Sequence, residues 1–169
     1  MKKNINIKYY RNRAFQKRKS VAVFLKKLGR RKNDNLYKNL KSANAAVWKE
    51  ISCLNCGNCC KTMTPTWKKH EIKRVAAYIG MDYDSYYKKY ITVDEDNGDL
   101  INKRTPCQHF DGRSNKCQIY EVRPADCKKF PHILRKDFLD QKQVYLDNLH
   151  RCPATLLFLE KLETMLFKK

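Results

Sequence analysis

The chain has 169 residues, a length typical of one domain. Its 37 lysine and arginine residues outnumber its 17 aspartate and glutamate residues, which gives a formal net charge of +20. The longest apolar run near the start covers only residues 21–25, too few for the apolar core of a secretory signal or for a membrane span. We therefore expect a cytoplasmic protein that does not insert into membranes.

Most of the excess positive charge lies in residues 1–50, which hold sixteen basic and two acidic residues. We predict that this segment is a basic, helical N-terminal arm. Such an arm could make a weak nucleic-acid contact, because neutralising phosphates releases counterions. A solvated, partly helical arm explains the same charge, and no recognised nucleic-acid motif accompanies it.

Apolar residues recur at helical intervals in several segments from residue 17 onward. The spacing predicts helices over residues 17–28, from about 36 to 48, over 66–79 and over 82–90. Gly29 and Gly80 follow two of these segments as stop signals, and Asp82 can cap the last of them.

The second half of the chain carries turn signals. Asn97-Gly98 lies between the apolar residues 91–93 and 100–101, which predicts a β-hairpin. A second turn is expected at Asp111-Gly112, followed by a short strand at 119–120 and a short helix within 121–127. Pro153 can open a last helix, so that residues 154–169 pack on the domain. Together these elements predict a small α+β fold, mainly α, with helices around a cysteine-rich loop and one or two short β-hairpins.

Cysteines are the clearest chemical signal in the sequence. Four of the eight form the pattern C-x2-C-x2-C-C, so one loop presents four sulfur atoms, and Gly57 within it can adopt the positive φ of a tight turn. In a reducing compartment, clustered cysteines are more often metal ligands than disulfides. We therefore predict a metal-binding domain over residues 51–153. Its predicted ligands are Cys53, Cys56, Cys59, Cys60, Cys107, Cys117, Cys127 and Cys152.

The cysteine motifs occur in a specific combination. The C-x2-C-x2-C-C loop is followed by Thr105-Pro106-Cys107, by residues 117–131 with their Arg123-Pro124-Ala125-Asp126-Cys127 core, and by Cys152-Pro153. In this combination of motifs the chain resembles the CxxCxxCC family, also called YkgJ-like, whose members are described as zinc- or iron-chelating domains. The resemblance covers residues 53–153 and implies metal binding by all eight cysteines. This chain has Gln108 and His109 where the family often has small apolar residues.

The sequence leaves the metal open between zinc and iron. Two tetrahedral zinc sites would use all eight cysteines. Consecutive side chains diverge, so Cys59 and Cys60 are expected to reach different metals or to bridge a cluster. The C-x2-C-x2-C spacing is also found in bacterial ferredoxins, which keeps an iron–sulfur cluster in view.

Other polar residues near the cysteines are expected to support the site. His109 and His132 could act as ligands, but packing or hydrogen bonding is the stronger interpretation of each. Arg123 is expected to hold the cysteine-bearing loop through hydrogen bonds to carbonyl groups or through salt bridges, with Glu121 as one partner.

These patterns indicate a metal-binding protein that coordinates zinc or an iron or iron–sulfur centre, with a metal ion as its partner. An iron–sulfur redox protein is one alternative. A metal-dependent transferase is another, because some flagellin lysine methylases look like longer proteins that carry a similar cysteine cluster. This chain has no Gly-rich strand-to-helix turn that would bind a methyl donor. A third alternative is an RNA-binding module with a structural metal.

Overall fold

A computed structural model of the chain describes residues 5–30 and 34–167. Arg31 and Lys32, which belong to the predicted basic arm, lie outside the described residues. The chain forms two compact units: a helical unit, Met1–Cys56 with Pro131–Lys169, and a cysteine unit, Gly57–Phe130. The predicted boundaries at residues 50 and 153 stay a prediction.

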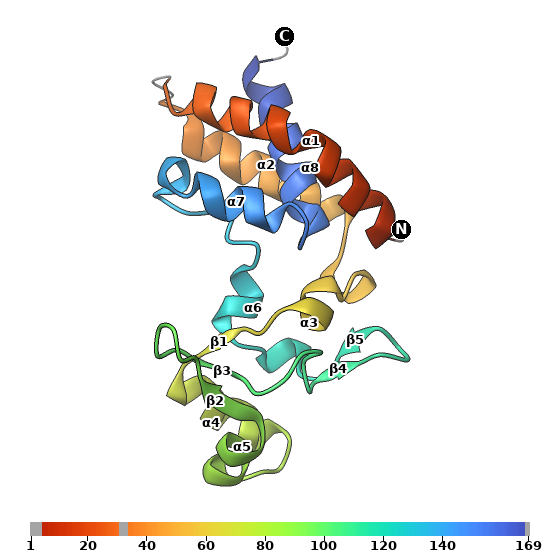
Figure 1. The fold of residues 1–169 in the computed structure, drawn as a ribbon, viewed down its shortest axis with the longest axis vertical. Coiled ribbons are helices and arrows are strands. Elements are labelled where there is room, and N and C mark those ends of the chain that lie inside the picture. Colours follow the sequence, from red (N-terminus) through yellow and green to blue (C-terminus); the bar gives the residue numbers. More distant parts are fainter. Residues whose placement is uncertain (1–4, 31–33, 168–169) are drawn as a thin grey trace. The chain divides into compact units, whose positions relative to one another are not determined.

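The helical unit is built from helices on both sides of the cysteine unit in the sequence. They are α1 (Ile7–Leu28), α2 (Leu36–Glu50), α7 (Lys142–Asn148) and α8 (Pro153–Phe167), with 3-10 turns η1 (Cys53–Asn55) and η3 (Phe138–Asp140). Helix α8 packs against α1 and α2, and α1 also contacts α7 (Figure 1). No helix in the described part of the chain is long and apolar enough to cross a membrane.

Helix α1 confirms the predicted helix over residues 17–28 but begins earlier, at Ile7. The Oδ1 atom of Asn6 accepts a hydrogen bond from Tyr9 N at 3.0 Å, which caps the helix there. Only Ala14 is buried in the first half of α1, so that half has little apolar periodicity. Lysine and arginine are good helix formers and continue the helix without it.

Helix α8 is apolar on most of its surface, which allows it to be buried against both α1 and α2. Its buried residues are Pro153, Ala154, Thr155, Leu156, Phe158, Leu159 and Leu162. At its edge, both Glu160 carboxylate oxygens accept hydrogen bonds from Arg13 Nη2, at 2.8 and 2.7 Å. Lys161 Nζ lies 2.5 Å from a carboxylate oxygen of Glu50. These pairs join α8 to α1 and to α2.

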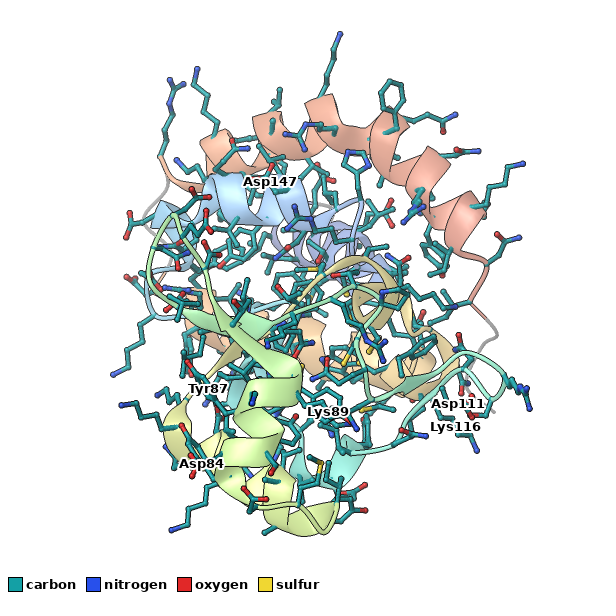
Figure 2. The ribbon with its side chains drawn as sticks, turned by 60° about the horizontal axis from the view of Figure 1, so that its bottom comes forward. Asp84, Tyr87, Lys89, Asp111, Lys116 and Asp147 are labelled. Carbon is teal, nitrogen blue, oxygen red and sulfur yellow. The ribbon has the colours of Figure 1, made fainter. Side chains whose placement is uncertain are left out.

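The cysteine unit combines short helices with two small antiparallel sheets. Its helices are α3 (Asn58–Thr62), α4 (Lys69–Tyr78), α5 (Tyr83–Tyr90) and α6 (Ala125–Lys129), with a 3-10 turn η2 (Tyr120–Val122). Strands β1 (Thr66–Trp67), β3 (Leu100–Asn102) and β2 (Ile91–Val93) form one sheet in that order. Strands β4 (Phe110–Asp111) and β5 (Lys116–Cys117) form the other, in which Asp111 and Lys116 lie side by side (Figure 2). The predicted fold class, α+β and mainly α, is confirmed.

Several predicted elements of the cysteine unit are confirmed. The β2–β3 hairpin pairs Val93 with Leu100 around the Asn97-Gly98 turn. Asp82 caps α5, because its Oδ1 atom accepts a hydrogen bond from Ser85 N at 2.8 Å. The turn at Asp111-Gly112 is present between β4 and β5.

Two predicted elements are wrong in part. The sequence predicts that Thr66 and Trp67 begin a helix, but they pair with β3 as a strand and the helix starts only at Lys69. The strand expected at 119–120 lies instead at Lys116–Cys117, where β4 provides a pairing partner. Ile119 is buried in the core of the unit rather than paired. In both places, long-range pairing decides the local structure.

Glu71 connects two of the helices although it is only 3% exposed. Its Oε2 atom accepts a hydrogen bond from Lys68 N at 2.9 Å, at the start of α4. Its Oε1 atom accepts one from Ala125 N at 2.7 Å, at the start of α6. A carboxylate is well placed at a helix N-terminus, where N–H groups lack partners. Glu71 therefore fixes α6, which carries Cys127, to α4.

We predict that Glu71→Ala lowers the free energy of unfolding by about 2–3 kcal/mol, because two partly buried N–H groups lose a charged acceptor. Equilibrium urea unfolding measures this change. Glu95→Ala, which removes an exposed carboxylate from the β2–β3 turn, is the control and should leave the midpoint within error. Equal midpoints for the two variants would contradict this role of Glu71.

Candidate metal centre

The predicted ligands are divided between the two units. The cysteine unit contains Cys59, Cys60, Cys107, Cys117 and Cys127, and the helical unit contains Cys53, Cys56 and Cys152. All eight side chains are partly buried. The boundary between the units falls between Cys56 and Gly57, inside the C-x2-C-x2-C-C motif.

Gly57 positions the first two cysteines of the cysteine unit. It caps α3 in the left-handed conformation, with φ at 61°, as the sequence predicted. A Cβ atom there would lie 2.7 Å from Phe110 Cε2, so the Phe110 ring can pack here only because glycine has no side chain. Cys59 and Cys60 follow in the first turn of α3.

The Cys59 and Cys60 thiols shift each other's pKa in opposite directions. The side-chain hydrogen bond from Cys60 lowers the pKa of Cys59 to about 7, and the same interaction together with burial raises the pKa of Cys60. The expectation that these consecutive side chains reach different metals or bridge a cluster stays a prediction.

Backbone pairing brings two further cysteines near α3. Cys107 N donates a hydrogen bond to Cys60 O at 2.8 Å, which ties the start of the 107–118 segment to α3. Cys117 then pairs with Phe110 across the β4–β5 sheet. Burial raises the pKa of both thiols, while backbone N–H groups of His109 and Ile119 oppose this shift by hydrogen bonding to the respective sulfur atoms.

Cys127 completes the group from α6. Burial raises its pKa, and negative charge on Cys59 and Cys107 would raise it further. Several buried thiols therefore disfavour each other's ionised form. A bound cation would offset both the burial and this repulsion, so the donor set fits a soft, thiolate-binding metal.

A cavity of about 40 Å³ lies among these thiols. Its walls are formed by Cys59, Cys60, Met63, Thr64, Pro65, Cys107, Asp126, Cys127 and Phe130. It has room for a water-sized guest. Within residues 5–30 and 34–167, no three or more His, Cys, Asp or Glu side chains are grouped closely enough to hold a metal ion. Four thiols of the cysteine unit, those of Cys59, Cys60, Cys107 and Cys127, thus line one cavity without forming a closed coordination shell.

His109 and Arg123 make supporting contacts. His109 Nε2 lies 2.7 Å from the Tyr86 hydroxyl, the two rings stack, and burial lowers the pKa of His109 to about 4. Arg123 donates a hydrogen bond to the carbonyl of Tyr120, and its guanidinium carbon lies 3.6 Å from the centre of that ring. The predicted carbonyl contact of Arg123 is confirmed. His132 lies in the helical unit with a φ of 60°.

Asn102 is a buried polar residue that sequence reasoning missed. It is 2% exposed at the end of β3, and its Oδ1 atom accepts hydrogen bonds from Trp67 Nε1 at 2.9 Å and Gln108 Nε2 at 3.0 Å. A signal was present, because Asn102 continues the apolar strand that begins at Leu100 and stands five residues before Cys107. Buried asparagines need partners, which marks such a position for a polar role.

Residues 52–153 match the family CxxCxxCC, described as "Putative zinc- or iron-chelating domain". The chain belongs to this family. It is also 32% identical over 84 residues to "Uncharacterized protein MJ0661" of Methanocaldococcus jannaschii. That alignment covers 49% of this chain and 45% of the relative, so the chain matches less than half of the relative's length. No solved structure matches the chain.

We predict that Gly57→Ala destabilises the protein by about 2–4 kcal/mol, because left-handed backbone and a clash with Phe110 add together. Gly98→Ala is the matched control, since Gly98 also has a positive φ, at 77°, but a Cβ there meets no atom within 4 Å. It should cost only about 1–2 kcal/mol. Thermal unfolding of both variants tests the difference, and equal losses would show that the Phe110 contact adds nothing.

Proposed function

We propose that the cysteine unit binds zinc or iron through Cys59, Cys60, Cys107 and Cys127, with Cys117 as a further candidate ligand. The observation that carries this proposal is the cavity that the first four thiols line together. The family's description as zinc- or iron-chelating agrees with it. Thiolate sulfur is the donor that zinc and iron–sulfur centres share. Cys53, Cys56 and Cys152 stay predicted ligands.

The arrangement of Cys59 and Cys60 bears on the number of metals. Consecutive side chains diverge, so we expect the sulfur atoms of Cys59 and Cys60 to reach different metals or to bridge a cluster. A zinc centre would supply mainly folding free energy, whereas an iron–sulfur centre would add electron transfer. Thiols that bind a metal must stay reduced, as they do in the cytoplasm. We therefore propose that the protein is cytoplasmic.

We predict that protein purified anaerobically contains zinc or iron and that Cys127→Ser and Cys59→Ser each lose most of it. Elemental analysis gives the stoichiometry, and a visible spectrum of the same sample separates an iron–sulfur centre from zinc. Thr64→Ala is the control, because Thr64 lines the same cavity without a sulfur ligand. Full metal content in both cysteine variants would refute the proposal.

A second candidate function rests on α1, which carries no acidic residue in 22 positions. Lys8, Phe15, Lys19 and Lys26 are exposed and follow one another at intervals of seven, four and seven residues, so they share one face. Phe15 is 76% exposed. Lysines around an exposed aromatic ring suit single-stranded nucleic acid, whose phosphates bind the cations and whose bases stack on the ring. We propose this face as an RNA contact surface.

We predict that Lys19→Gln/Lys26→Gln lowers the magnitude of the salt slope of single-stranded RNA binding by about 1.4, since each phosphate contact contributes about 0.7. Lys73→Gln/Lys88→Gln is the control, with the same charge change on exposed residues of the cysteine unit, and should leave the slope unchanged. Fluorescence anisotropy across a salt series measures the slope. Equal slopes for the two double variants, or binding only to anionic lipid vesicles, would refute an RNA surface on α1.

A further inference from the structure

Basic side chains gather at one end of the β2–β3 pair. The two strands are antiparallel, with Ile91 opposite Asn102, so the residues just outside this pair lie side by side. Lys103 N donates a hydrogen bond to Tyr90 O at 2.9 Å, which extends the contact by one residue. The register therefore brings the last turn of α5, which carries Lys89 (labelled in Figure 2), next to the segment that follows β3.

A cavity of about 310 Å³ is lined by both segments. Its walls are formed by Lys89, Tyr90, Lys103, Arg104 and Gln108, so they contain three cationic side chains and no carboxylate. Small-molecule sites usually measure about 300–1,000 Å³. This cavity has room for a small organic anion, unlike the cavity of about 40 Å³ among the thiols.

The three cations of this wall are available to a ligand. Lys89, Lys103 and Arg104 are exposed, and within residues 5–30 and 34–167 none of them forms a salt bridge. Lys103 Nζ donates a hydrogen bond to Lys88 O, which leaves it two further N–H donors. Lys89 Nζ lies 5.1 Å from the centre of the Tyr90 ring. These contacts orient the ammonium groups without neutralising them, so a bound anion would relieve their mutual repulsion.

The two uncharged residues of the wall are held in place. Gln108 Nε2 donates a hydrogen bond to Asn102 Oδ1 at 3.0 Å. The centre of the Tyr90 ring lies 5.0 Å from that of Tyr86 and 5.7 Å from that of His109. The cavity therefore combines three positive charges with a fixed ring and a fixed amide.

We propose that this cavity binds a diphosphate group, either free or as part of a nucleotide. A diphosphate carries about three negative charges near neutral pH, which matches the three cations. The planar guanidinium of Arg104 can donate two parallel hydrogen bonds to phosphate oxygens, while the lysine ammonium groups bind as point charges. This inference goes beyond the proposed function, because no cysteine lines the cavity and the site needs no metal.

The net charge of +20 attracts every polyanion, so a test must separate the cavity from this general attraction. Arg104→Gln removes a cation from the wall. Arg113→Gln is the matched control, because Arg113 is exposed in the β4–β5 turn, lies outside the wall and loses the same charge. Both side chains are exposed, so both variants should fold.

Isothermal titration calorimetry of the full-length protein with pyrophosphate and with adenosine diphosphate, at constant ionic strength, measures the affinity. We expect saturable binding, an affinity about 10-fold lower or weaker still in Arg104→Gln, and an unchanged affinity in Arg113→Gln. Equal affinities in these two variants, or no saturable binding of either probe to the wild-type protein, would overturn the inference.

Lys89→Gln shows whether the probe lies in this cavity. Lys89 lines the basic cavity but not the cavity among the thiols, so its loss should weaken binding as that of Arg104 does. A probe held instead by a metal at the thiols would bind Lys89→Gln as tightly as the wild-type protein, and that result would also overturn the inference.

Comparison of the probes identifies the source of the diphosphate. Equal affinities for pyrophosphate and adenosine diphosphate would show that the cavity recognises the diphosphate alone. Tighter binding of the nucleotide would show that the nucleoside also contacts the wall, where Tyr90 supplies a ring. Single-stranded RNA forms a third arm: if Arg104→Gln weakens RNA binding while neither small probe binds, the cavity is a nucleic-acid contact and the proposal is wrong.

Discussion

Burying several thiols around one small cavity is the constraint on which the cysteine unit depends. Each thiol loses hydration on burial, and each ionised sulfur makes ionisation of its neighbours harder. Short helices and two- or three-residue strands supply little hydrophobic area to compensate. A cation that binds thiolates reverses the sign of these interactions, so metal binding and folding would be coupled.

Buried polar groups in this unit reinforce that dependence. Glu71 joins α4 to α6, His109 bonds Tyr86, and Asn102 collects two donors on one oxygen. Glu71 thereby anchors α6, the helix that carries Cys127, and His109 lies two residues after Cys107. Such directional contacts fix the positions of short elements that hydrophobic packing alone holds weakly.

The sequence predicted the parts of this structure that depend on local signals. Helical periodicity located α2 and α5, and the Asn97-Gly98 pair located the β2–β3 hairpin. Helical spacing predicted the wrong structure at Thr66–Trp67, where pairing with β3 overrides it. No local signal in the sequence indicated the partner of Asn102, because Trp67 lies in a distant segment. The cysteine spacing identified the candidate ligands but could not divide them between two units. Contacts between distant residues determine that division, and no local pattern records them.

The connectivity of the two units has a consequence for how the protein is made. The cysteine unit is one continuous segment, whereas the helical unit needs α1 and α2 from the start of the chain and α8 from its end. During synthesis, residues 57–130 leave the ribosome while the helical unit still lacks α8. The cysteine unit can therefore fold, and could bind metal, before α8 is synthesised and completes the core that it forms with α1 and α2.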